Sequence, residues 1–227
     1  FLPLFITQFL GAFHDNLFKS AMVAVLLFDA AGGVAQAGDQ EKILVTLATA
    51  VFILPYVLFS ALAGQYADKY SKDSVIRRVK MVEIAVAVLG AVALLSGSLV
   101  LSFVTLFALG AQSAFFNPSK FSILPQHLED HELVGGNALI GVGTFLAILV
   151  GTIIGMTFIN VPFGLWILSG LFIVSAVVGY LSSTKIPLAP SVDKDLKVTY
   201  NIVAESYRIV SSIFTGKRSI IESALGI

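Results

Sequence analysis

The chain has 227 residues, of which 57% are hydrophobic and 12% are charged. Soluble domains usually carry about 25% charged residues, so this chain would expose too much apolar surface in water, and we expect a lipid environment. Its 14 basic and 14 acidic residues cancel, which argues against nucleic acid as a partner, and the absence of cysteine excludes disulfides, Cys-ligated metals and thiol chemistry.

Six stretches are long and apolar enough to cross the hydrocarbon core of a bilayer, which takes about 20 residues in a helix. The predicted spans are residues 2–28, 43–66, 79–95, 99–116, 133–159 and 162–181. The connections after the third and fifth spans are short, so these neighbours are predicted to form antiparallel hairpins. The sequence thus predicts an all-α polytopic membrane protein, with a six-span helical bundle over residues 1–183.

The composition changes after the sixth span. Residues 184–219 are predicted to form a cytoplasmic linker with an amphipathic helix, because apolar positions from residue 198 onward recur at helical spacing. Residues 220–227 are apolar again, and we expect them to begin a truncated seventh span. Since the first residue is Phe1 and not Met, we expect the N-terminus to be trimmed.

The positive charges predict the orientation. Of the 14 lysines and arginines, 12 lie in or beside the connections after the second, fourth and sixth spans. Lys42 is the one cation in the opposite connections, and Lys19 lies inside the first span. Because cytoplasmic loops are enriched in Lys and Arg, the even-numbered span ends and the N-terminus are predicted to be cytoplasmic.

The first span contains polar residues near its middle: His14, Asp15, Asn16 and Lys19. An ionisable group at the bilayer centre costs about 2.5–3.5 kcal/mol on insertion scales, so these side chains are expected to face other helices or a wet cavity. One helical stripe contains Gln8, Gly11, Asp15, Lys19 and Met22. We expect Asp15 and Lys19 to form an ion pair and interpret the polar set as a substrate site. The alternative is a pair satisfied within the bundle, without a ligand.

Further polar and small residues occur inside the other spans. Glu83 is expected to pair with Lys80 or to reach the membrane interface, and Gln112 to line a cavity or bond to a neighbouring helix. Pro55 is predicted to bend the second span. The fifth span carries small residues at a four-residue period, which predicts a close helix contact: Gly143, Ala147, Gly151 and Gly155.

The histidines give no indication of catalysis. His127 and His131 flank two acidic residues in an interfacial loop, without a serine or a metal-ligand set nearby in the sequence. We therefore expect a protein that is not an enzyme and that has no metal and no cofactor.

The connection after the second span reads Gly64-Gln65-Tyr66-Ala67-Asp68-Lys69-Tyr70-Ser71-Lys72-Asp73, followed by Arg77-Arg78. It resembles the signature loop of the major facilitator superfamily, in which an aspartate caps or pairs with cytoplasmic helix ends. The matching positions are Gly64, Asp68, Lys69, Lys72, Arg77 and Arg78, with Ser71 at the usual second glycine. The resemblance implies the N-terminal half of a carrier, a missing C-terminal half, and a loop that stabilises one transport state.

Two segments, residues 8–19 and 116–125, together with residues 136–139 and 143–144, are similar to bacterial lysophospholipid transporters, which are sometimes fused to acyltransferase and acyl-ACP synthetase domains. The resemblance implies transport of lysophospholipid across the bacterial inner membrane for re-acylation. His14 stands where asparagine is more usual in that family, and the fifth span lacks the proline of drug–proton antiporters.

A lysophospholipid needs polar groups for its headgroup and apolar surface for its tail. Asp15 and Lys19 offer partners for an ammonium and a phosphate, and Lys120 is expected at the cytoplasmic surface, as a phosphate ligand or an ordinary positive-inside charge. The tail is expected against Phe13, Phe18, Phe115 and Phe116. Two alternatives remain: a carrier for a water-soluble solute or drug, and a membrane anchor for a fused or separate acyltransferase.

Overall fold

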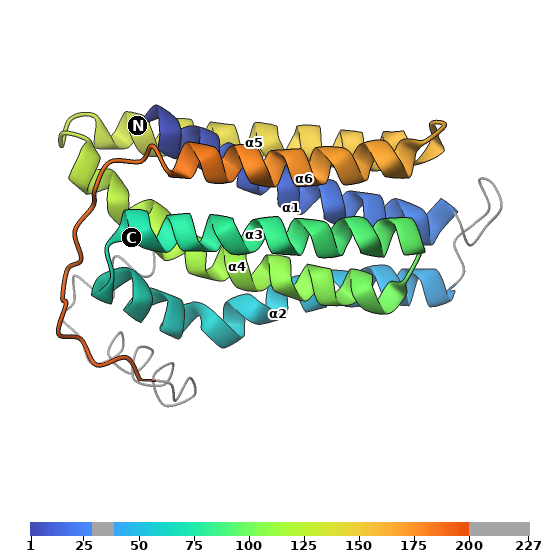
Figure 1. Cartoon of the computed structure of the whole chain (residues 1–227), viewed down its shortest axis with the longest axis horizontal. Coiled ribbons are helices and arrows are strands. Elements are labelled where there is room, and N and C mark those ends of the chain that lie inside the picture. The colour runs from blue at the N-terminus through green and yellow to red at the C-terminus, as the bar shows by residue number, and fades with distance from the viewer. Residues whose placement is uncertain (29–38, 200–227) are drawn as a thin grey trace.

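The computed structural model describes residues 1–28 and 39–199. Six long helices run side by side in one bundle (Figure 1). They are α1 (Leu2–Phe28), α2 (Asp39–Lys69), α3 (Lys72–Ser96), α4 (Leu99–His127), α5 (Leu133–Thr157) and α6 (Gly164–Ser183), with the 3₁₀ turn η1 (Phe158–Asn160) between the last two. The part of the chain described contains no strand, which confirms the all-α prediction.

Within the described residues, five helices, α2 to α6, are long and apolar enough to cross a membrane. Helix α1 has 27 residues and lies in the same bundle, and its polar side chains lower its hydropathy. These features agree with the predicted polytopic membrane bundle. Most of the predicted amphipathic helix and the start of a seventh span lie outside the described residues.

Packing within the bundle follows a repeating pattern. Helix α1 packs against α5 and α6, α4 packs against α2 and α3, and α3 also packs against α6. Exchanging α1–α3 with α4–α6 leaves this pattern unchanged, as expected for the inverted repeats of three helices that many carriers contain. This repeat lies in the packing of the helices and is not apparent in the residue sequence.

Several helix boundaries differ from the predicted spans. Helix α3 begins seven residues before the predicted start at residue 79, and α4 continues past the predicted end at residue 116 to His127, through Pro118 and Pro125. Membrane helices tolerate proline because neighbouring groups satisfy the freed backbone carbonyls. For the same reason α2 continues through Pro55, on a bowed path in Figure 1.

The small residues of α5 bring it close to α1. A Cβ atom at Gly151 would lie 2.7 Å from the backbone oxygen of Phe13, and one at Gly155 would lie 2.6 Å from that of Leu17. Both distances are too short for an alanine without movement of the backbone. The predicted close contact along this face of α5 is confirmed.

After α6, residues 184–199 cross the end of the bundle where the N-terminus and the α2–α3 connection also lie (Figure 1). We call this segment the strap. Its residue Ala189 accepts a hydrogen bond of 2.9 Å from the backbone of Lys72 and donates one of 3.1 Å to Oδ1 of Asp73. The strap is thus bonded directly to the start of α3.

Candidate functional site

A cavity of about 420 Å³ lies among helices α1 to α5. Its volume is in the range of small-molecule sites in proteins. Its acidic, basic and amide side chains are Gln8, Asp15, Asn16, Lys19, Lys80, Glu83, Gln112, Asn117 and Lys120. The predicted stripe of α1 therefore does face a cavity, except that Met22 is in the hydrophobic core.

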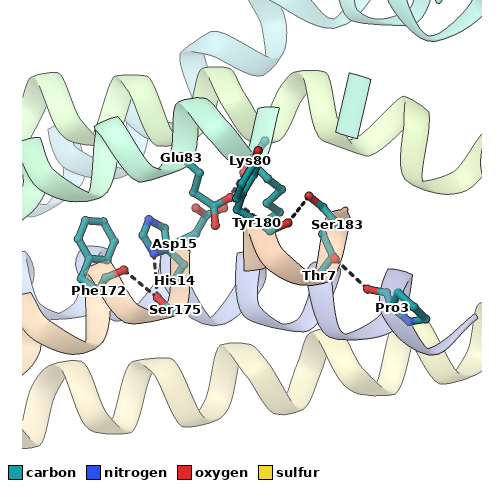
Figure 2. A network of polar contacts seen from close by, with 11 residues as sticks. Pro3, Thr7, His14, Asp15, Lys80, Glu83, Phe172, Ser175, Tyr180 and Ser183 are labelled. Carbon is teal, nitrogen blue, oxygen red and sulfur yellow. Dashed lines mark hydrogen bonds and ion pairs between the residues drawn. The ribbon is translucent and has the colours of Figure 1, made fainter. Parts of the chain in front are cut away.

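A buried ion pair forms one wall of the cavity. Nζ of Lys80 lies 2.6 Å from Oε2 of Glu83, and both side chains are 2% exposed. Gly11 makes room for this ammonium, because a Cβ atom there would lie 2.6 Å from Nζ of Lys80. The predicted pairing of Glu83 with Lys80 is confirmed, and the pair points inward, not to the membrane interface (Figure 2).

Asp15 does not pair with Lys19. Its Oδ2 accepts a hydrogen bond of 2.6 Å from the hydroxyl of Ser113 on α4, and its Oδ1 is buried without a hydrogen-bond partner among the described residues. Nζ of Lys19 lies 5.4 Å from the ring centre of Phe52 on α2, a cation–π distance. The predicted Asp15–Lys19 ion pair is wrong, because the two side chains turn to different neighbouring helices.

Lys120 lies inside the bundle. Its ammonium donates a hydrogen bond of 3.1 Å to Oε1 of Gln8 and lies 4.5 Å from the ring centre of Phe121. The amide of Gln8 in turn donates to the hydroxyl of Thr144 and, at 3.3 Å, to the backbone oxygen of Ile140. The expected surface position of Lys120 is wrong, because α4 continues through this residue and turns it towards the cavity.

His14 lies outside the cavity lining. It is fully buried between α1 and α6, where it stacks on Phe172 with ring centres 3.8 Å apart, and its Nδ1 lies 3.0 Å from the hydroxyl of Ser175 (Figure 2). Its contacts are therefore those between packed helices, and it does not line the cavity in which a site role was expected. Phe13 and Phe18 are likewise in the hydrophobic core, and neither lines this cavity.

Three buried oxygens around the cavity have no hydrogen-bond partner in the described part of the chain: Oδ1 of Asp15, Oε1 of Glu83 and Oε1 of Gln112. An unpaired buried acceptor costs about 1–3 kcal/mol. An N–H or O–H donor from a ligand would remove this cost at each of these oxygens that it reaches. The lysines in the same lining supply the opposite charge, so the cavity suits a ligand that carries both signs.

Sequence reasoning missed several cavity residues. Lys80 was counted as a cytoplasmic cation, and Tyr56, Ser113 and Asn117 were not considered as site residues. A signal existed for Lys80, because it stands three residues before Glu83 on a predicted span. No sequence signal pointed to Ser113, since single serines are common in membrane helices.

The signature loop differs from the expected arrangement. Asp68 exposes its side chain, and its backbone carbonyl accepts hydrogen bonds of 3.0 and 3.1 Å from Val192 and Asp193 of the strap. The buried carboxylate of the loop is Asp73, which bonds to Arg77 at 3.1 Å as well as to the strap.

The basic residues of the loop all lie on helices, and Lys69 is the last residue of α2. Lys72, Arg77 and Arg78 lie on α3, outside the connection in which they were predicted. The ammonium of Lys72 donates a hydrogen bond of 3.2 Å to the carbonyl of Pro190, and Lys69 and Arg78 each lie 5.9 Å from the ring centre of Tyr70. At Gly64 a Cβ atom would meet nothing within 4 Å, so packing does not require this glycine.

The bundle of membrane helices around a buried, charged cavity has the architecture of a membrane transporter. The sequence profile of the Major Facilitator Superfamily matches residues 4–219. The chain belongs to this superfamily, as the signature loop predicted.

The relatives are transporters of greater length. The lysophospholipid transporter LplT of Cronobacter sakazakii is 32% identical over 154 residues, which are 68% of this chain and 35% of the relative, and the same values hold for LplT of Salmonella heidelberg. The matched part of the chain thus spans about a third of the length of these curated relatives.

A solved structure agrees with the fold. The structure of a mutant peptide transporter POT in complex with sulfate matches 97% of this chain and 45% of its own chain, with a TM-score of 0.56 at 18% identity. At this identity the likeness bears on the fold alone.

Proposed function

We propose that this chain forms the N-terminal half of a carrier that moves lysophospholipid across the bacterial inner membrane for re-acylation. The observation that carries the proposal is the buried cavity in which three unpaired acceptor oxygens lie among lysines. The names of the relatives support the choice of ligand.

The headgroup is assigned to two sides of the cavity. A primary ammonium donates to Oδ1 of Asp15, Oε1 of Glu83 and Oε1 of Gln112, acceptors of the cavity residues that lack partners within the described part of the chain. The phosphate pairs with Lys19 and Lys120, whose ammonium groups line the same space. A charge-assisted hydrogen bond is roughly twice as strong as a neutral one, so this arrangement selects a headgroup that can donate.

The carrier needs a second half to complete the cavity, and its missing C-terminal partner is part of the proposal. The signature loop faces the cytoplasm in the proposed orientation. The exposed carboxylate of Asp68 is available to meet the other half in one transport state, while Gly64, Lys69, Lys72, Arg77 and Arg78 complete the loop.

A carrier for a water-soluble solute is the second candidate. The polar lining of the cavity favours it, because the ionisable side chains alone would suit a small zwitterion. A membrane anchor for an acyltransferase would not require a buried charged cavity, which is costly to build.

The test is uptake by proteoliposomes that contain the complete carrier. Labelled lysophosphatidylethanolamine should accumulate, lysophosphatidylcholine should accumulate more slowly because its quaternary ammonium has no N–H donor, and glycerophosphoethanolamine should compete weakly. Uptake of a water-soluble zwitterion without lysolipid uptake would favour the second candidate. Absence of any uptake from correctly folded carrier would favour the anchor.

A further inference from the structure

A second cavity, of about 430 Å³, lies between α2 and α3 and has α4 as its floor. Helix α2, which contributes Tyr66 to the lining, packs mainly against α4, and α3 packs against α4 and α6. Helices α2 and α3 pack much less against each other, which leaves a groove between them. Most of its wall is apolar and includes Val75, Val82, Val86, Ala108, Ala111 and Phe115. We call it the α2–α3 groove.

The groove adjoins the charged cavity. Val79 and Gln112 line both spaces. Gln112 is buried, and its Oε1 has no hydrogen-bond partner among the residues that the structure describes. A polar compartment and an apolar compartment therefore meet at one pair of side chains.

The groove is about as long as one leaflet of the hydrocarbon core is thick. Val75 and Val86 lie eleven residues apart on α3, which is about 16 Å at 1.5 Å per residue. One leaflet contributes half of a hydrocarbon core of about 30 Å. Arg78, exposed and stacked over Tyr70 at 5.9 Å, marks the polar end of the groove.

We propose that the α2–α3 groove holds the acyl chain of the lysophospholipid while its headgroup occupies the charged cavity. This inference rests on the proposed function and adds the place of the tail. An amphiphile with a single chain fits two adjoining compartments of opposite polarity. Because lipid is as apolar as the groove wall, the affinity of the chain for the groove depends on how closely the wall packs around it, so added bulk in the groove weakens binding.

The experiment blocks the groove from its open side. Val82 lines the groove and is 55% exposed, so Val82→Trp adds bulk there without entering the core. Val88 is 49% exposed on the same helix and lines neither cavity, so Val88→Trp is the matched control. Ala108→Phe blocks the groove from its floor as a second variant.

Binding is measured on the purified complete carrier with palmitoyl and octanoyl lysophosphatidylethanolamine. Val82→Trp should weaken binding of the palmitoyl lipid by about tenfold, the size expected from overpacking a site. The octanoyl lipid, whose chain fills less of the groove, should lose less, and Val88→Trp should bind both lipids like the wild type.

The outcomes separate this inference from the proposed function. If Val82→Trp and Ala108→Phe both bind the palmitoyl lipid like the wild type, the tail lies elsewhere and the proposed function stands. If the wild-type carrier binds neither lipid, the proposed function fails, and the assignment of the groove fails with it.

Discussion

The hydroxyl of Ser113 donates a hydrogen bond of 2.6 Å to Oδ2 of Asp15, across 98 positions of sequence. This bond joins α1 to α4 at the wall of the cavity. It holds one carboxylate oxygen in place and leaves Oδ1 without a partner among the described residues. The carboxylate is thus held by a neighbouring helix at the wall of the cavity.

Asp15→Asn should reduce lysophosphatidylethanolamine uptake by the complete carrier to background, because the charge that pairs with the ammonium is gone. The carbonyl of an asparagine still accepts from Ser113, so the melting temperature should stay near that of the wild type. Uptake is measured in proteoliposomes and normalised to folded protein. Uptake per folded molecule at the wild-type level would leave Asp15 with a packing role alone.

Lys80→Met should lower stability strongly, because it leaves the buried carboxylate of Glu83 without its partner at 2.6 Å. Breaking one side of a buried pair costs about 3–5 kcal/mol. The double variant Lys80→Met/Glu83→Gln removes both charges and should recover part of that loss. Thermal unfolding in detergent measures both, and equal melting temperatures for the single and double variants would contradict a coupled pair.

Gly151→Ala should lower the free energy of unfolding by about 1–3 kcal/mol, the usual cost of overpacking, because its Cβ atom would lie 2.7 Å from the carbonyl oxygen of Phe13. Gly141 on the same helix meets nothing within 4 Å, so Gly141→Ala is the control and should be neutral or slightly stabilising. The comparison is made by thermal unfolding. Equal effects at the two glycines would mean that α5 does not approach α1 closely.

Asp73→Ala should release the strap from the start of α3. The backbone N–H of Ala189 would lose its acceptor at 3.1 Å, and an unsatisfied buried donor costs about 1–3 kcal/mol. Hydrogen exchange of strap residues should become faster. Asp68→Asn keeps the backbone carbonyl that bonds to the strap, so the exchange rate of strap residues should stay unchanged. We expect this variant to slow the transport cycle of the complete carrier. Unchanged exchange in Asp73→Ala would show that the strap is held elsewhere.

Single cysteines should test the proposed orientation in a background that has no cysteine. Asp39, with 95% of its side chain exposed, and Asp130, also exposed, lie near opposite ends of the bundle. Asp39→Cys should react with an impermeant thiol reagent in intact cells, and Asp130→Cys only after the cells are opened. The reverse pattern would place the cation-rich end outside.

The sequence by itself determined the class of fold. Long apolar stretches must be helical in lipid, because every backbone polar group needs a partner within its own segment. The cost of a charge in hydrocarbon likewise required Asp15 and Lys19 to face inward. The period of small residues, among them Gly151 and Gly155, predicted a close contact without naming α1 as the partner helix.

Only the tertiary structure decided which groups meet. Asp15 had a partner within one helical turn in Lys19, yet it bonds to Ser113 because helix packing brings α4 to that face of α1. The loop carboxylate that holds the strap is Asp73, since the acceptor must reach Ala189, more than a hundred residues later. Such contacts depend on distances between separate helices, which the packing of side chains sets and no local sequence pattern records.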